Sequence, residues 1–306
     1  MNKPFKTINE QIEILNSRGV ITDEETAGIL RREGYYSIVN GYKGLFLHHS
    51  KDGQESYKHG VTFNEIYRLF TFDRSLRMIL FKYIAIAESA LKTITAYKFA
   101  EAHKSDHSDY LKPGSYRVDG GYPGLVQIFI GDIKKILGQT PDAPTHRPKP
   151  YIKHYMDKYG QVPIWVLTNY LTIGQAVKFF EFQTEAIRWA IANEFTRHHQ
   201  MEAQTSKKIK PTELARTFAH IKDIRNICAH DERLYCARVS PRSNITFTNA
   251  VTDLSLILPA SKDIALRKDI IAEIISCSHD IKSITRPQLL KQMGARSIDD
   301  LAPFEN

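Results

Sequence analysis

The sequence predicts an all-α protein, a mainly helical bundle. Two observations favour this class: apolar residues recur every three or four positions over long stretches, and helix-capping pairs precede the first of them. Only a short segment near residues 244–258 has a strand-like composition, which predicts at most one small β-hairpin. With 306 residues, 42% of them apolar and 25% charged, the chain can form two or three packed subdomains.

Two short helices are expected at the start of the chain, each preceded by a capping box. In this motif Thr and Glu side chains satisfy each other's free backbone N–H groups. The two pairs are Thr7 with Glu10 and Thr22 with Glu25. We expect Gly19 to end the first helix and the second helix to run to about Arg32. Glycines and tyrosines then alternate over 34–42 as turns. Residues 1–60 are therefore predicted to form an N-terminal helical cap.

A long helix is predicted from Phe63 to about Ala102, because no proline interrupts its apolar pattern. The apolar positions of this pattern are Ile66, Leu69, Phe70, Leu76, Ile79, Leu80, Tyr83 and Ile84. This helix begins the main domain, which we place at residues 61–306.

Two Gly- and Pro-rich segments, 113–124 and 138–150, follow as predicted loops, with a shorter helix over 125–137 between them. We therefore interpret residues 103–160 as a loop insertion in the main domain. Further helices are expected to start at Pro163 and to cover 174–182, 185–198, 211–235 and 264–281. Short strands are possible at 245–247 and 254–258.

Composition restricts the class of protein. The net charge of +8 and the pI near 9.2 favour partners rich in phosphate, although charge alone leaves nucleic-acid binding at about even odds. No apolar run reaches the roughly 18 residues of a membrane-spanning helix, and the N-terminus does not resemble a secretion signal. We therefore expect a cytoplasmic protein with no membrane partner.

Three cysteines, Cys228, Cys236 and Cys277, cannot all pair within one chain. None has the spacing of a zinc site, so we expect reduced structural thiols, no metal and no cofactor.

The segment 223–235 contains the residues most suited to chemistry. If the helix continues, Asn226, His230 and Arg233 share a face, and the long side chain of Arg225 can reach the same phosphate. RNA cleavage without metal needs a proton acceptor, a proton donor and a cation for the developing phosphorane charge. Imidazole and guanidinium supply these groups, and an amide can orient either of them. Arg225, Asn226 and His230 are the candidate catalytic residues.

The spacing between Arg225 and His230 is by itself weak evidence for a catalytic motif, because Arg147 and His154 meet a looser version of the same pattern in a Pro-rich segment. The region around the motif is basic, with nine Lys or Arg against four Asp or Glu between residues 207 and 242. The candidate RNA-binding residues are Lys207, Lys208, Lys210 and Arg238. The plain alternative is a helix-end ion-pair cluster in which the motif pairs with nearby acids, namely Asp223, Asp231 and Glu232.

The motif resembles the Arg-polar-x-x-x-His motif of the HEPN ribonuclease superfamily, and the whole chain resembles the abortive-infection (Abi-like, AbiD/AbiF type) phage-defence family of bacteria. The likeness spans nearly the full length in several ordered segments. They are Thr7–Gly19, Gly34–Tyr42, Tyr67–Glu88 with Asp73-Arg74-x-x-Arg77, Pro163–Gly174 and Arg225–Tyr235.

The resemblance implies a HEPN-like helical core, metal-independent endoribonuclease activity, a role in phage defence and a homodimer that joins two motifs in one composite site. It also implies a co-encoded small structured non-coding RNA as a partner. Glu88 and Arg77 match supporting polar positions, and Glu88 is expected to steer the histidine. Asp231 is a departure, because many relatives have a second His there; its charge puts full activity in doubt.

Alternatives remain at each level. The chain can instead be a catalytically silent protein that holds RNA, or a helical protein that binds or modifies nucleotides. Glu88 and Arg77 can be buried partners of neighbouring charges. The tyrosines of 34–42 can stack on bases, but packing is favoured. Trp165, which follows Pro163, is expected to anchor the core at a helix start.

Overall fold

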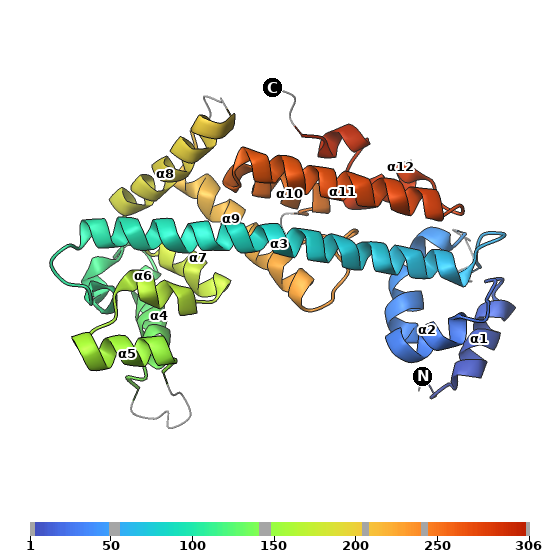
Figure 1. Cartoon of the computed structure of the whole chain (residues 1–306), viewed down its shortest axis with the longest axis horizontal. Helices are drawn as coiled ribbons and strands as arrows, with labels where there is room; N and C mark the ends of the chain where they lie inside the picture. The colour runs from blue at the N-terminus through green and yellow to red at the C-terminus, as the bar shows by residue number, and fades with distance from the viewer. Residues whose placement is uncertain (1–3, 49–55, 141–147, 204–207, 240–243, 304–306) are drawn as a thin grey trace. The chain divides into compact units, whose positions relative to one another are not determined.

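The computed structural model describes residues 4–48, 56–140, 148–203, 208–239 and 244–303, and these ranges form helices joined by turns (Figure 1). Within them there is no strand, and β-pairing is limited to isolated bridges. The predicted all-α class is confirmed.

The α-helices are α1 (Ile8–Ser17), α2 (Thr26–Glu33), α3 (Phe63–Ala102), α4 (Tyr122–Ile136), α5 (Pro150–Tyr159), α6 (Ile164–Leu167), α7 (Ile173–Glu181), α8 (Glu185–Ala203), α9 (Pro211–Ala229), α10 (Phe247–Ile257), α11 (Ala260–Asp280) and α12 (Arg286–Met293). Short non-α turns are η1 (Tyr36–Asn40), η2 (Lys43–Phe46), η3 (Asp109–Leu111), η4 (Pro113–Ser115), η5 (Thr168–Tyr170) and η6 (Ile298–Leu301). The predicted long helix and α3 have the same bounds.

The chain divides into two compact units. The first comprises residues 1–81, 224–252 and 263–306, and the second comprises 82–223 and 253–262. The predicted boundary between residues 60 and 61 remains a prediction.

The first helix starts and ends as the sequence predicts, and the second ends as predicted but starts later. Thr7 caps α1 in a complete capping box with Glu10, and Gly19 follows the helix with a φ of 88°. Thr22, by contrast, caps nothing. Its hydroxyl donates to Asn16 Oδ1 at 2.9 Å. The Asp23 carboxylate accepts the first N–H groups of the α2 turn instead, and that helix begins later than predicted.

In the first unit, polar contacts tie the N-terminal part of α3 to α11 and the segment after it. Arg68 bonds Glu273 at 3.0 Å and Asp280 at 2.8 Å. The buried Glu65 carboxylate accepts the backbone N–H groups of Lys282 at 2.6 Å and Ser283 at 2.9 Å. The chain after residue 263 is therefore part of the unit that contains α1 and α2.

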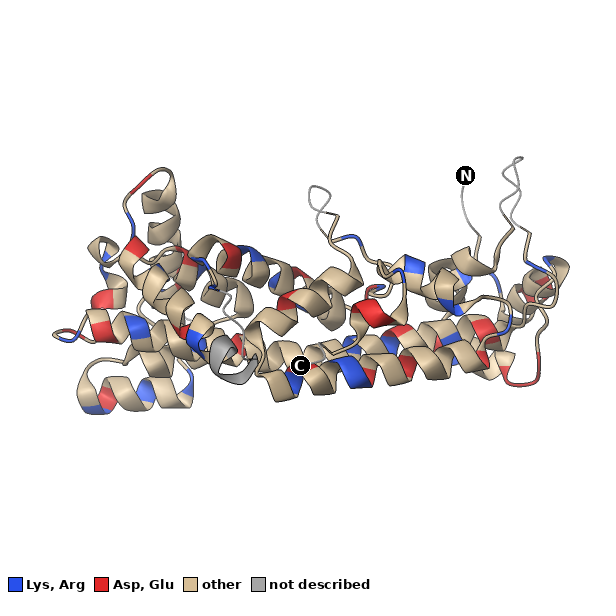
Figure 2. Cartoon of the chain, turned by 90° about the horizontal axis from the view of Figure 1, so that it is seen from above, with Lys and Arg blue, Asp and Glu red and all other residues tan. Residues whose placement is uncertain are grey.

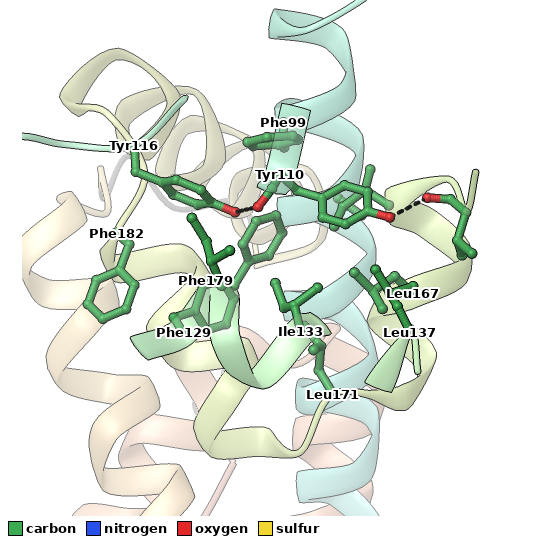
Figure 3. Close-up of a cluster of buried hydrophobic side chains, with 14 of the residues drawn as sticks. Phe99, Tyr110, Tyr116, Phe129, Ile133, Leu137, Leu167, Leu171, Phe179 and Phe182 are labelled. Carbon is green, nitrogen blue, oxygen red and sulfur yellow. Dashed lines mark hydrogen bonds between the residues drawn. The ribbon is translucent and has the colours of Figure 1, made fainter. Parts of the chain in front are cut away.

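An aromatic core fills the second unit around the C-terminal part of α3, α4 and α7 (Figure 3). Phe129 stacks on Phe179 with ring centroids 5.9 Å apart, and Tyr116 meets Phe129 edge-on. The buried phenols are satisfied, because Tyr116 donates to Tyr110 O and Tyr110 donates to Val162 O, both at 2.7 Å. Much of the predicted loop insertion thus contributes core residues, while helix 125–137 is confirmed as α4.

The predicted hairpin near 244–258 is wrong, because residues 247–257 form helix α10. Thr246 and Asn249 bond each other reciprocally at the helix start. The buried side chains Phe247, Ala250, Val251 and Leu254 have a helical spacing. Residues 254–258 have a strand-like composition on their own, but residues 254–257 continue the helix that begins at Phe247.

Charged residues of both signs are interspersed along the described helices (Figure 2). Among the described residues, no helix combines the length and the apolar character that crossing a bilayer requires.

Candidate active site

The predicted catalytic residues lie at the C-terminal end of α9. Apolar side chains on one face of this helix are buried, and they are Leu214, Phe218, Ile221 and Ile224. Because that face packs inward, Asn226 lies on the exposed side, and His230, just past the last helical residue, is exposed as well.

The three candidate side chains differ in exposure. The imidazole of His230 and the amide of Asn226 are open to solvent, whereas Arg225 is half-buried. The Arg225 guanidinium carbon lies 5.8 Å from the centre of the Phe81 ring, and its Nε is buried without a hydrogen-bond partner in the described residues. A half-buried guanidinium and an accessible imidazole, five residues apart in the sequence, are groups of the kind that bind phosphate.

The acids near the motif do not clamp it. Asp231 pairs with Arg77, and Asp223 pairs with Lys222 at 3.2 Å. Within the described ranges, no ion pair joins an acid to Arg225 or His230. The alternative of a helix-end ion-pair cluster is therefore not what the side chains form.

Helix α9 ends at Ala229, six residues before the predicted end at Tyr235. The N–H of Glu232 bonds Ile227 O at 3.2 Å, and Asp231 adopts a φ of 56°, as in a Schellman cap. Arg233 thus leaves the helix and does not share a face with Asn226, which corrects the prediction. Its guanidinium instead donates to Gly41 O at 2.7 Å.

A network centred on the buried Asp73, the Asp73 cluster, holds the chain directly after the motif. It consists of Tyr42, Asp73, Arg77, Asp231, Leu234 and Tyr235. The Asp73 carboxylate accepts from the Tyr42 hydroxyl at 2.7 Å and from Arg77 at 2.8 Å. It also accepts the backbone N–H groups of Leu234 at 3.1 Å and Tyr235 at 2.6 Å. One carboxylate therefore joins α3, the N-terminal segment and the segment after α9.

Arg77 completes this network. It also donates to Glu232 O at 3.1 Å and to the Asp231 carboxylate, and its single positive charge, shared with Asp73, offsets part of the charge of Asp231. Arg77 is a positioning residue by these contacts. This pairing reduces the expected effect of Asp231 on activity, because a carboxylate paired with Arg77 repels a phosphate at the motif less strongly than an unpaired one.

Burial governs the proton affinities around the motif. It raises the pKa of Asp73 above its ordinary value, although the surrounding donors oppose this. It also raises the pKa of the Tyr42 phenol, and Asp73 adds to that effect. Burial raises the pKa of Cys228 to about 12, so this thiol stays protonated within one turn of the exposed imidazole.

The other predicted site residues in the described ranges take no part in the Asp73 cluster. Glu88 belongs to the second unit and pairs with Lys92 at 2.7 Å, which is the structural role considered for it. Arg238 donates to Ala237 O and Gln292 O. Lys208 and Lys210 are exposed, and Lys207 lies outside the described residues. Their part in RNA binding stays a prediction.

Sequence reasoning missed the role of Asp73 as the centre of the cluster. An available signal was its position four residues before Arg77 on a helix with apolar neighbours, a spacing at which an acid and an arginine pair. It also missed a carboxylate–imidazole pair in the second unit, where His220 Nδ1 lies 2.8 Å from Asp253 Oδ2. Thr217 bonds the same carboxylate, which fits a link between α9 and α10.

In the described part of the chain, no three His, Cys, Asp or Glu side chains are grouped so that they could hold a metal ion. The three cysteines are free thiols.

Comparison with known proteins gives one family. The chain matches the model of a family described as Abi-like protein over residues 28–236, which is more than half of its length. This span includes α3, the Asp73 cluster and the candidate catalytic residues. No curated protein matches the chain, and no solved structure matches it.

Proposed function

Because the chain belongs to the Abi-like protein family, which indicates a role in abortive infection, we propose that it is an endoribonuclease of phage defence. In this proposal it cleaves RNA without metal, and Arg225, Asn226 and His230 are its catalytic residues. The observation that carries the proposal is the solvent-exposed imidazole of His230 directly after α9, which no ion pair among the described residues restrains, five residues after the half-buried Arg225.

The cleavage is an internal transesterification. The 2′-oxygen of the nucleotide attacks the adjacent phosphorus, its proton is removed, and the bond to the 5′-oxygen breaks as that oxygen gains a proton. His230 transfers protons, and Arg225 holds the phosphate oxygens as their charge grows. Asn226, one helical turn before His230, orients the imidazole or the phosphate. The products are a 2′,3′-cyclic phosphate and a 5′-hydroxyl.

Exposure of the motif is also consistent with a second copy of the chain meeting it, so we propose a homodimer with a composite site. Light scattering of the purified protein measures this directly, and a monomer at micromolar concentration would contradict it. A small structured non-coding RNA is the proposed second partner. Sequencing of the RNA that copurifies with the protein tests for it.

The test of the reaction is cleavage of RNA in the presence of EDTA, with end-group analysis of the products. We expect 2′,3′-cyclic phosphates from the wild-type protein and none from H230A, which should still bind RNA. The matched control is H154A, since His154 is also exposed and belongs to the looser version of the motif. This variant should cleave normally.

Cleavage that persists in H230A would remove His230 from the mechanism. Tight RNA binding with no cleavage by any variant would favour the silent RNA-binding protein instead. A nucleotidyl or ADP-ribosyl group transferred to a partner would favour the nucleotide-modifying alternative.

A further inference from the structure

The second unit contains a groove of about 770 Å³ that the proposed reaction does not use. One wall is the part of α3 between Ala85 and Glu101 together with Lys104 just after the helix, and the other is the segment Trp165–Asn169 of α6 and η5. Its volume lies within the range of ligand-binding clefts, about 300–1,000 Å³. Both walls belong to one compact unit, so the groove is a property of that unit alone.

Two aromatic side chains line the groove from opposite elements and remain exposed. Trp165 is 49% exposed and Tyr97 is 62% exposed. The prediction that Trp165 anchors the core is therefore wrong. Its neighbours Ile164 and Leu167 take the buried positions of this short helix, which leaves the indole on the outer side. Exposed aromatic faces on two walls suit the stacking of planar rings.

Small side chains keep the groove open between these aromatics. Ala96 and Thr168 are buried and line its bottom, and Ala85, Ser89 and Ala100 add short side chains along α3. A flat ring can therefore approach the helix closely.

The edge of such a ring would meet a hydrogen-bond acceptor. Asn169 lines the groove, and its Nδ2 donates to Trp165 O at 3.2 Å and Val166 O at 3.4 Å. With its amide N–H groups directed to helix carbonyls, the remaining group of Asn169 is the acceptor Oδ1. This oxygen can accept from the exocyclic amino group of cytosine or adenine, whereas uracil offers only its ring N3–H, which lies between two carbonyl groups.

The charges along the groove are balanced. Lys92 pairs with Glu88 at 2.7 Å, and the other two charged groups are Lys104 and Glu101. Phosphate attraction is therefore a minor part of binding here, and the affinity should depend weakly on salt.

We propose that this groove binds unpaired bases of an RNA strand, stacked between Trp165 and Tyr97, and prefers bases with an exocyclic amino group over uracil. The proposal rests on the proposed function only in taking RNA as the ligand. It adds a base-binding site outside the catalytic motif.

The chain has two tryptophans, so the W189F variant leaves Trp165 as the sole indole emitter. We would titrate full-length W189F/H230A, which does not cut RNA in the proposed mechanism, with cytidine and uridine hexanucleotides. Trp165 fluorescence should be quenched, with tighter binding of the cytidine oligomer and little change in affinity between low and moderate salt. The W165F/H230A protein, which keeps Trp189 outside the groove, should show no quenching.

Adding Y97A should weaken the affinity about tenfold, as loss of one stacking partner does, whereas Y97F should retain it. The matched control is Y159A, because Tyr159 is similarly exposed in the same unit but does not line the groove. This variant should bind normally.

Absence of quenching, or an affinity unchanged by Y97A, would contradict the proposed binding site. Equal binding of the two oligomers would overturn the preference for amino groups. A shift of Trp165 emission with protein concentration alone would show that a second copy of the chain fills the groove. The titration is independent of cleavage, so failure of the ribonuclease proposal and failure of the groove proposal appear in different assays.

Discussion

Two polar regions of the first unit contrast with each other. In the Asp73 cluster every charge is buried or paired, and one carboxylate serves four donors. In the motif, which directly precedes the segment 231–235 of the cluster, the imidazole of His230 is exposed, and no ion pair among the described residues restrains it. Both regions contain an arginine and a polar partner on or beside a helix.

The contrast separates two roles for similar side chains. A buried polar network is costly unless every member is satisfied, so its residues mainly hold the chain in place. Polar groups left open cost little in stability and stay available to a ligand. Substitution of a residue in the Asp73 cluster should therefore destabilise the fold, whereas substitution of an exposed residue of the motif should change only activity.

The largest effect should come from D73A. It leaves Arg77, the Tyr42 hydroxyl and two backbone N–H groups without their acceptor, which should cost about 3–5 kcal/mol of unfolding free energy. Urea unfolding measures the change. The control D132A removes an acid from a surface pair with Lys135 and should cost less than about 1 kcal/mol. Similar losses in both variants would contradict the contrast.

The H230A variant should lose at least about a hundredfold in cleavage rate, the usual contribution of a general acid or base. Its free energy of unfolding should stay within about 0.5 kcal/mol of wild type, because the side chain is exposed. Cleavage rates and urea unfolding of the same preparation test both halves. A destabilised H230A would place the imidazole in the fold instead.

Cys228 should react slowly with alkylating reagents, although it lies only two residues before the exposed His230. With the pKa of the thiol raised to about 12, the reactive thiolate is scarce at pH 8, and alkylation should be at least about thirtyfold slower than in urea-unfolded protein. Mass spectrometry of iodoacetamide-treated protein follows the reaction at each cysteine. Rapid modification of Cys228 would mean that the inner side of this helix turn is open as well.

The smallest effect concerns Asp231, which has a positive φ and a pairing with Arg77. Both variants lose the pairing with Arg77, but D231A must still adopt the left-handed backbone conformation, which glycine in D231G adopts without strain. We expect D231A to be less stable than D231G by about 1 kcal/mol. Urea unfolding of the two variants separates backbone from charge, and equal stabilities would show that the backbone conformation costs nothing.

The helices could largely be predicted from the sequence because their signals are local. The capping box at Thr7 and the apolar spacing of α3 place their helices within a residue or two. The end of α9 could not be predicted, because residue 231 has its left-handed conformation while Arg77, far away in the sequence, holds its side chain.

The candidate site residues are close in the sequence, so a local motif is enough to propose Arg225, Asn226 and His230, and their catalytic roles remain a prediction. The Asp73 cluster joins segments about 160 residues apart, and no local pattern reveals such pairings. Trp165 shows the converse, since an apolar residue at a helix start gave no indication that it would face a groove.

The composition of the first unit has a consequence for biosynthesis. Arg68 and Glu65 of α3 bond to Glu273 and to the backbone of Lys282, which are synthesised 205 and 217 residues later. A nascent chain released before that point lacks the partners of Arg68 and Glu65. The unit that contains the motif can therefore complete these contacts only after residue 282 has been synthesised.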